Sequence, residues 1–169
     1  MELNKEAIYW AKTKEEAIIP TKNDENAGYD IYACIPNNKV CMIKPLQTVL
    51  VPTGIAAAVS DDYYLQVQER GSTGKLGMKY SAGVIDSSYR GEIFIAITNV
   101  SDKSIFIGND DVLKKADNDS KSTKYPINKA IAQLVLHNVP KLKSKEITYD
   151  ELKNIPSKRG TGKLGSSGK

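Results

Sequence analysis

Short runs of apolar and β-branched residues recur along this chain at intervals of about ten residues, with turn-forming residues between them. This spacing is typical of a β-sandwich or jelly roll, and it does not suit βαβ units. The one convincing helical signal is a capping box formed by Thr148 and Glu151, at the start of a short turn. We therefore predict an all-β fold with strands over 6–11, 28–34, 39–43, 47–52, 54–59, 63–69, 92–100, 104–107 and 130–139.

The domain organisation follows from length and local composition. A chain of 169 residues suffices for one domain with a real core and is short for two. We expect a β domain over 1–156 and a flexible, glycine-rich tail over 157–169. The polar insert 108–124 lies between two strong strands and is longer than a hairpin loop, so it forms either a disordered excursion or a small accessory element.

Several function classes are excluded by what the chain lacks. Cys34 and Cys41 have no CxxC spacing, and His137 is the only histidine, so a Cys/His zinc site and a histidine-dependent triad are both excluded. No apolar run approaches the roughly 20 residues that span a bilayer, and the first residues contain no signal-peptide core. We expect a cytoplasmic protein with no membrane partner.

The distribution of charge is more informative than the net charge of +4. The basic residues include only three arginines, Arg70, Arg90 and Arg159, and each precedes a glycine, which suggests bidentate recognition of phosphate or carboxylate or else a structural ion pair at a turn. The tail 157–169 has four basic residues and no acidic one, so the rest of the chain is balanced. General nucleic-acid binding is therefore not expected.

Two segments carry candidate chemistry. RGSTG (70–74) offers a guanidinium, two hydroxyls and open backbone amides, which could cradle an oligophosphate or simply form a turn. In GVIDSSYRG, an apolar run is followed by Asp86 at an expected turn, and Tyr89 comes three residues later. Asp86 could orient water or a sugar hydroxyl, or cap the turn, and Tyr89 could stack on a ligand ring or fill the core.

Five glycine-flanked clusters together resemble the motifs of the homotrimeric dUTP diphosphatases, the dUTPases, in order and spacing. The third cluster is highly specific, and the fifth nearly so because it stands at the C-terminus. The resemblance covers most of the chain. The clusters are NAGYD (26–30), RGSTG (70–74), AGVIDSSYRGE (82–92), NKAIAQ (128–133) and RGTGKLGSSG (159–168).

The resemblance implies a jelly-roll subunit in a closed homotrimer, with active sites between subunits and the tail of one subunit closing a neighbouring site. It also implies hydrolysis of dUTP to dUMP and pyrophosphate with Mg²⁺ bound by the triphosphate. Asp86 would be the catalytic residue that activates water for attack on the α-phosphorus. Tyr89 would exclude a 2′-hydroxyl, and backbone groups between Gly83 and Phe94 would pair with uracil.

The phosphate side is likewise implied by the resemblance. Arg70 and Gln133 would contact the phosphate chain together with Ser72 or Thr73, and Arg159 with the tail serines would hold the γ-phosphate. Asp30 would support the metal indirectly, through water. The implied substrate-binding residues are Arg70, Gly71, Ser72, Thr73, Gly83, Tyr89, Phe94, Gln133, Arg159, Leu164, Gly165, Ser166 and Ser167.

The chain also departs from the family pattern. Gly71 separates Arg70 from Ser72, 128–130 lacks the usual turn glycine and acid, and Leu164 replaces the aromatic residue that covers the base. Two further interpretations stay open. The insert 108–124 could bind a regulatory protein, as in some phage-type members, and a dCTP deaminase-like nucleotide enzyme would share the superfamily.

Overall fold

The computed structural model describes residues 3–116 and 122–162 of the chain. Its residues group into two compact units, Met1–Val139 and Pro140–Lys169. The described part of neither unit contains a helix with the length and apolarity needed to cross a membrane. The division into a domain over 1–156 and a tail over 157–169 stays a prediction.

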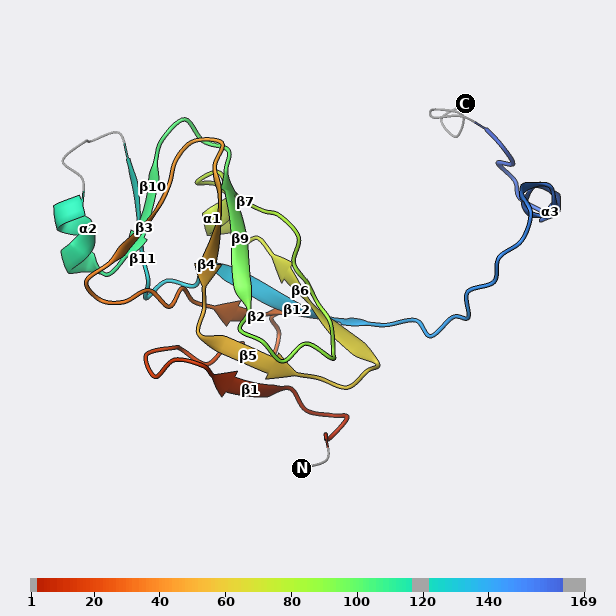
Figure 1. Ribbon diagram of the computed structural model, residues 1–169, viewed down its shortest axis with the longest axis horizontal. Coiled ribbons are helices and arrows are strands. Elements are labelled where there is room, and N and C mark those ends of the chain that lie inside the picture. The colour runs from red at the N-terminus through yellow and green to blue at the C-terminus, as the bar shows by residue number, and fades with distance from the viewer. Residues whose placement is uncertain (1–2, 117–121, 163–169) are drawn as a thin grey trace. The chain divides into compact units, whose positions relative to one another are not determined.

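The first unit consists mainly of short strands, which confirms the predicted all-β class (Figure 1). All the strands predicted from the sequence are present, with ends that shift by a few residues. Within the described residues the strands form four sheets. The first pairs β1 (Tyr9–Lys12) with β5 (Ile55–Ala58), and the second has the order β11 (Thr123–Pro126), β10 (Ile105–Gly108), β3 (Val40–Ile43). The third has the order β2 (Gly28–Ile31), β12 (Ala132–Asn138), β6 (Tyr63–Gln68), β8 (Val84–Ile85), and the fourth β4 (Thr48–Pro52), β9 (Phe94–Asn99), β7 (Met78–Tyr80).

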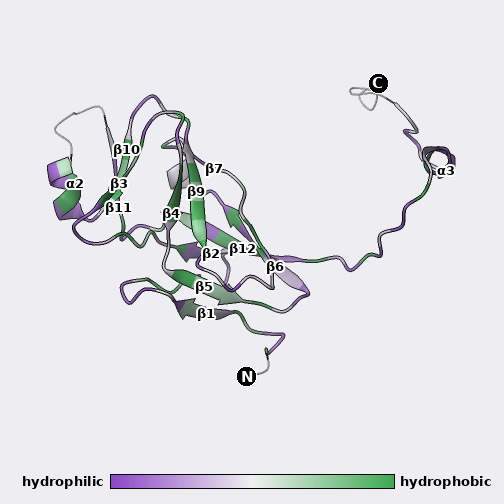
Figure 2. Ribbon diagram, viewed as in Figure 1, coloured by the Kyte–Doolittle hydropathy of each residue, from purple (hydrophilic) through white to green (hydrophobic). Residues whose placement is uncertain are grey.

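Side chains along each strand point alternately to the two faces of the sheet, and those on the inner face form the core. Ile95 and Ile97 of β9 are fully buried, whereas Phe94 on the opposite face is 43% exposed. Figure 2 shows hydrophobic residues concentrated along β4, β5 and β9. Branched aliphatic side chains supply most of the core: its largest fully buried residues are Ile31, Ile43, Ile55, Leu65, Met78, Ile93, Ile95, Ile97, Ile105, Ile107, Ile131 and Leu134.

Strand β12 positions the polar residues of the motifs because it lies between β2 and β6. Leu134 is fully buried, so the adjacent Gln133 points to the other face of the sheet. In the antiparallel register, Gln133 lies opposite Asp30 on one side and Gln68 on the other. Side chains of directly opposed residues share a face, so Asp30 and Gln133 emerge together.

The insert contains an accessory element over its described residues. Helix α2 (Asp110–Ala116) follows β10 and buries Leu113, and β11 then pairs with β10 in parallel. A parallel pair needs a crossover connection rather than a hairpin, and the insert supplies it. The expectation of a sandwich without βαβ units is therefore wrong for this one segment. Residues 117–121 of the insert lie outside the described residues.

The remaining helices are short. Helix α1 (Gly71–Gly74) forms within the RGSTG segment, directly after β6. Helix α3 (Tyr149–Asn154) lies in the second unit, and Thr148 and Glu151 form its capping box, which confirms the predicted signal. Thr148 Oγ1 accepts from the Glu151 amide at 3.2 Å, and Glu151 Oε2 accepts from the Thr148 amide at 2.7 Å.

Candidate functional site

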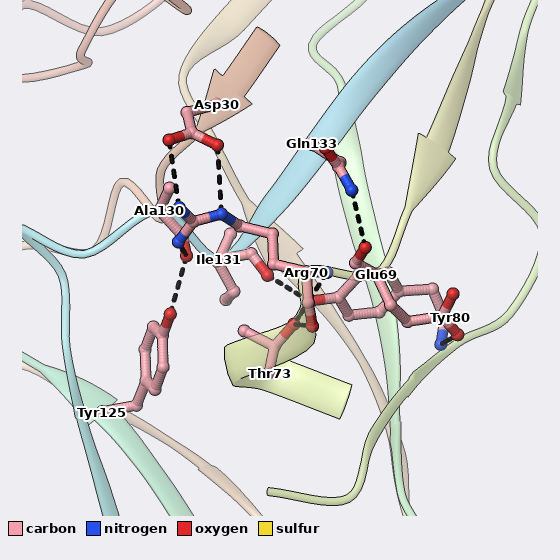
Figure 3. A network of polar contacts seen from close by, with 9 residues as sticks. All are labelled: Asp30, Glu69, Arg70, Thr73, Tyr80, Tyr125, Ala130, Ile131 and Gln133. Carbon is pink, nitrogen blue, oxygen red and sulfur yellow. Dashed lines mark hydrogen bonds and ion pairs between the residues drawn. The ribbon is translucent and has the colours of Figure 1, made fainter. Parts of the chain in front are cut away.

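An ion pair between Arg70 and Asp30 is the centre of the first polar cluster (Figure 3). Arg70 Nε lies 3.0 Å from Asp30 Oδ1, and Nη2 donates to Oδ2 at 3.2 Å, so the contact is bidentate. Arg70 Nη1 also donates to the Ala130 carbonyl at 3.1 Å. Both charged side chains remain about one-third exposed, at 32% and 33%, and can still be reached from solvent.

The backbone around Arg70 is fixed by Thr73. The Thr73 hydroxyl accepts from the Arg70 amide at 3.2 Å and donates to the Arg70 carbonyl at 3.1 Å. Thr73 is completely buried, whereas Ser72 is exposed. Of the two hydroxyls left open by the sequence, only that of Ser72 therefore faces outward.

The hydroxyls of the half-buried Tyr80 and the buried Tyr125 anchor the turn before β12. Tyr125 donates to the Ala130 carbonyl at 2.7 Å, and Tyr80 donates to the Ile131 carbonyl and lies 2.9 Å from Thr73 Oγ1. Burial raises the pKa of Tyr80 to about 12, and burial also raises the pKa of Tyr125. Both phenols therefore stay protonated and donate across the neutral pH range.

We expect Tyr80→Phe to lower the free energy of unfolding by about 1–3 kcal/mol, because it leaves the buried Ile131 carbonyl without its donor. Since the pKa of Tyr80 is higher in the folded protein, its contribution is present below about pH 10 and is lost as the pH rises through about 12. Urea unfolding should therefore show that the difference in the free energy of unfolding between wild type and variant becomes smaller between about pH 10 and pH 12. Tyr149→Phe, at an exposed residue, is the control. If that difference became larger with rising pH, the Tyr80 hydroxyl would not be the donor to the Ile131 carbonyl.

Gln133 and Glu69 connect β12 to the end of β6. Gln133 Nε2 donates to the Glu69 carbonyl at 2.8 Å. Partial burial disfavours the charged Glu69 carboxylate, but hydrogen bonds from its own amide, the Tyr80 amide and Lys79 outweigh that effect, so its pKa is lowered. Gly28 lies beside this contact, and a Cβ there would come within 2.9 Å of Gln133 Oε1.

The structure brings one group of the predicted residues together around a polar cavity of about 420 Å³. Asp30 and Gln133 come from the paired strands β2 and β12, and Arg70, Gly71 and Ser72 come from the start of α1. A cavity with a guanidinium, an exposed hydroxyl and an amide suits a phosphate chain.

A second group lines a separate cavity of about 270 Å³, which we call the hairpin cavity. Its lining includes Gly83, Asp86, Tyr89 and Phe94, all of them predicted site residues. None of the residues that line it also lines the 420 Å³ cavity. Among the described residues, these two groups of predicted residues therefore line two separate cavities, which we call the two half-sites.

Asp86 and Tyr89 close a turn at the edge of the hairpin cavity. The Tyr89 amide donates to the Asp86 carbonyl at 3.0 Å, and the Tyr89 hydroxyl donates to the Glu92 carbonyl at 2.9 Å. The Asp86 side chain is exposed, and no hydrogen bond or ion pair joins it to the rest of the described chain. A Cβ on Gly91 would meet the end of the Tyr89 side chain, so a larger residue there would require the exposed ring to shift from the position in which it bonds the Glu92 carbonyl.

Gly83 allows the hairpin to approach β6. It has φ +115°, and a Cβ there would meet Val67 Cβ at 2.9 Å. Its carbonyl accepts from the Val67 amide at 2.8 Å. The adjacent Ala82 also has positive φ, at 63°, which places two unusual backbone conformations at the start of the cavity wall.

Three residues that support these half-sites were given no role in the sequence prediction. Glu92 accepts from the Gly54 amide at 2.8 Å and from Lys14 Nζ at 3.1 Å, which ties the hairpin to the start of β5. Tyr80 and Tyr125 donate to the Ile131 and Ala130 carbonyls, respectively. Glu92 stands inside the third motif and could have been suspected, whereas nothing in the local sequence marks either tyrosine.

The tail contributes little to the described structure. Arg159 lies in the second unit, where its amide donates to Ser157 Oγ at 3.3 Å. Leu164, Gly165, Ser166 and Ser167, to which the family resemblance assigns substrate binding, lie outside the described residues.

The described residues offer no ready-made metal cage, since no three His, Cys, Asp or Glu side chains converge among them. Both Asp30 oxygens contact Arg70, and each carboxylate oxygen retains a further lone pair for water. This donor set fits Mg²⁺, which keeps several waters and is often held through substrate phosphates. It does not fit an ion held by protein ligands alone.

Comparison with known proteins adds two findings at the level of sequence. The family model for dUTPase matches residues 14–113. Over 161 residues, the chain is 34% identical to the deoxyuridine 5′-triphosphate nucleotidohydrolase of Hydrogenobaculum sp. (strain Y04AAS1), covering 93% of this chain and 94% of that protein.

Solved structures agree in fold. The Staphylococcus bacteriophage 80alpha dUTPase with dUPNHPP has a TM-score of 0.71 at 24% identity, covering 96% of this chain and 99% of that chain. A mutant dUTPase from phage phi11 of S. aureus, described with a structural Mg(II) ion, has a TM-score of 0.64 at 18% identity, covering 83% of this chain and 96% of that chain. At these identities the likeness concerns the fold alone.

Proposed function

Because the chain belongs to the dUTPase family, we propose that it hydrolyses dUTP to dUMP and pyrophosphate. The observation that carries the proposal is the hairpin cavity, where an exposed carboxylate and an aromatic ring share one short turn. Family membership supports the substrate, and the residues of the two half-sites support the chemistry.

The hairpin cavity would bind the nucleoside. Its wall turns at Gly83, and backbone groups between Gly83 and Phe94 would form hydrogen bonds to the uracil edge. Tyr89 is 45% exposed and its hydroxyl is held by the Glu92 carbonyl, so the ring would present a fixed face to the deoxyribose. Phe94, 43% exposed, adds apolar surface for the base.

Asp86 would act as the general base in the reaction. Its carboxylate would accept a proton from water as the water oxygen bonds to the α-phosphorus. The bond between the α-phosphorus and the bridging oxygen to the β-phosphorus would then break, and pyrophosphate would leave. An exposed carboxylate without a competing cation in the described chain is suited to this task.

The 420 Å³ cavity would bind the phosphates. A guanidinium has five N–H groups, and the N–H groups of Arg70 that do not bond Asp30, Ala130 or Tyr125 would bind phosphate oxygens. Ser72 and Gln133 would add neutral donors, and Gly71 leaves the backbone open to the ligand.

A homotrimer would unite the two half-sites. We place the hairpin cavity of one subunit against the phosphate cavity of a neighbour, with a tail carrying Arg159 and 164–167 closing the site. The separation of the two cavities within one chain supports this arrangement.

Magnesium would bind to the triphosphate, and Asp30 would hold its waters. Its chemistry would be to neutralise charge on the phosphates, which assists phosphoryl transfer. The phage phi11 protein described with a structural Mg(II) ion supports the presence of this metal in related folds.

A nucleotide panel tests the proposal. Pyrophosphate release should be rapid with dUTP and Mg²⁺, and nearly absent with dCTP, dTTP or UTP. The hairpin would reject the cytosine amine and the thymine methyl, and Tyr89 would reject the 2′-hydroxyl. Equal turnover of UTP and dUTP would remove the role of Tyr89, and ammonia release from dCTP would favour the deaminase alternative.

A regulatory role for the insert is a second candidate function. Asp111, Lys114 and Lys115 form an exposed charged face on α2, whereas Leu113 packs inward. The similar 80alpha protein is described among phage dUTPases that control transfer of virulence genes by a proto-oncogenic G protein-like mechanism. Such a face could bind a protein partner without entering either half-site.

Replacing Asp111, Lys114 and Lys115 by alanine should leave dUTP hydrolysis within about twofold, because alanine maintains the helix and surface changes cost little. Binding to any partner identified for the native protein should be lost. A large fall in turnover, with the fold intact, would place the insert in the active site instead.

A further inference from the structure

Glu92 is bonded at two points to the start of β5. Its carboxylate oxygen Oε1 accepts from the Gly54 amide at 2.8 Å. The peptide group between Glu92 and Ile93 makes the second contact, since the Ile93 amide donates to the Ile55 carbonyl at 2.7 Å. Gly54 directly precedes β5 and Ile55 begins it, so two adjacent backbone groups of one strand hold residue 92 in a single orientation.

The Gly54 amide is itself held in place. The Gly54 carbonyl accepts from the Thr13 amide at 2.8 Å, and the φ of Gly54 is +66°, a conformation in which a side chain would be strained. A Cβ at Gly54 would lie 2.7 Å from Ala17 Cβ, so the backbone passes close to its neighbours. An amide on so constrained a backbone offers the Glu92 carboxylate a donor in one fixed position.

Lys14 contacts the same carboxylate oxygen. Its Nζ lies 3.1 Å from Glu92 Oε1, the atom that also accepts from Gly54. The Glu92 side chain is only 16% exposed, whereas that of Lys14 is 40% exposed. The bond between Thr13 and Gly54 brings Lys14 to this place, although Lys14 and Glu92 are 78 residues apart in sequence. A largely buried carboxylate with an ammonium and an amide on one oxygen has little freedom to rotate.

This anchoring extends to the Tyr89 ring. The Tyr89 hydroxyl donates to the Glu92 carbonyl at 2.9 Å, on the opposite side of the peptide group whose amide bonds Ile55. Tyr89 is 45% exposed, so packing alone does not fix its ring. Both Tyr89 and Glu92 line the hairpin cavity. The position of the ring in that cavity therefore depends on the orientation of residue 92.

We infer, on the basis of the proposed function in which Tyr89 contacts the deoxyribose, that Glu92 is a positioning residue for sugar selectivity. Its bond to Gly54, supported by Lys14, keeps the Tyr89 ring where it excludes a 2′-hydroxyl. Glu92 touches no reacting atom in this role, because it acts through Tyr89. When the bond to Gly54 is lost, residue 92 can turn about the Ile93 contact, and the ring can move away from the sugar.

The measured quantity is the ratio of kcat/KM for dUTP to kcat/KM for UTP in the full chain. Glu92→Ala should lower this ratio by about tenfold, the effect of losing one hydrogen bond to a charged group. Glu92→Gln should retain most of the ratio, because an amide oxygen can still accept from Gly54. Lys14→Ala should lower the ratio by about two- to threefold, since a partly exposed ion pair contributes less.

Lys12→Ala is the matched control. Lys12 is an exposed lysine of the same segment, its Nζ donates to the Glu15 carbonyl at 3.2 Å, and it lines neither half-site in the described part of the chain. Its replacement should leave the ratio unchanged. Tyr89→Phe tests the coupling: without the hydroxyl, a second change, Glu92→Ala, should have little further effect on the ratio, because both changes break the same connection.

A merely structural role for Glu92 would lower the turnover of both nucleotides by the same factor. An unchanged ratio in a folded Glu92→Ala protein would therefore overturn the inference, and so would an equal loss in Lys12→Ala. A full additional loss in the Tyr89→Phe background would also overturn it, because Glu92 would then act by another route. If Glu92→Ala does not fold, an unchanged ratio in Lys14→Ala decides against the inference.

Failure of the proposed function looks different, since the wild type would then release no pyrophosphate from dUTP. The calorimetric Kd values for dUMP and UMP would still compare the two sugars in that case. A wild type that binds both equally would overturn the role of Glu92. One that prefers dUMP should lose about tenfold of that preference in Glu92→Ala.

Discussion

Asp86→Asn should reduce kcat for dUTP on the order of 10²-fold or more, while nucleotide binding is largely retained. The amide has nearly the same shape as the carboxylate and cannot accept the proton of the attacking water, and loss of a general base has effects of this size. The side chain is exposed and supports no described contact, so the fold should not change. Single-turnover hydrolysis and titration with a non-hydrolysable dUTP analogue measure the two quantities separately.

Asp102→Asn is the matched control, because Asp102 is another exposed turn aspartate, away from both half-sites. It should have wild-type kinetics. A folded Asp86→Asn protein with near wild-type kcat would remove Asp86 from the mechanism.

Gly83→Ala should have the largest effect on the fold of the hairpin. A side chain at φ +115° costs about 1–3 kcal/mol, and the new Cβ would also press on Val67, which is buried. We expect the melting temperature to fall by roughly 5 °C, and kcat/KM for dUTP to fall more than stability alone explains, because the cavity wall must move.

Gly74→Ala supplies the comparison for that variant. Gly74 lies at the end of α1, and nothing stands within 4 Å of the position a Cβ would take. Alanine there should be neutral or slightly stabilising. Equal melting temperatures for Gly83→Ala and wild type would show that the hairpin tolerates a side chain at this position.

The strands that could be predicted from sequence are those with a dense run of branched apolar residues. β9 and β12 carry such runs, and both are present. β8 has only two residues, and β11 is TKYP, a polar segment ending in proline, so local pattern could not identify either one. Parallel pairing of β11 with β10 depends on α2, which is a tertiary feature.

The candidate site could be predicted residue by residue but not in its assembly. The motifs contain Asp30, Arg70 and Gln133, and strand register brings them together. That Thr73 is buried while Ser72 is exposed depends on the turn of α1, which a GSTG segment does not indicate by propensity. Tyr80 bonds the Ile131 carbonyl, and Tyr125 acts on the same turn as Arg70, although these partners lie far apart in sequence. Motif spacing alone could not predict such contacts.

The contact between Tyr125 and Ala130 has a consequence for chimeras made between related chains. Tyr125 belongs to the strand that the insert delivers, yet its hydroxyl holds the carbonyl that also receives Arg70. Exchanging α2 alone would leave this contact in place, whereas exchanging the segment through β11 would transplant it. If the donor chain has no tyrosine at this position, the chimera loses the hydrogen bond to the Ala130 carbonyl. The phosphate cavity of the recipient is then altered by a change far in sequence from Arg70. The boundary of an exchangeable module is therefore better set before Thr123 than after Pro126.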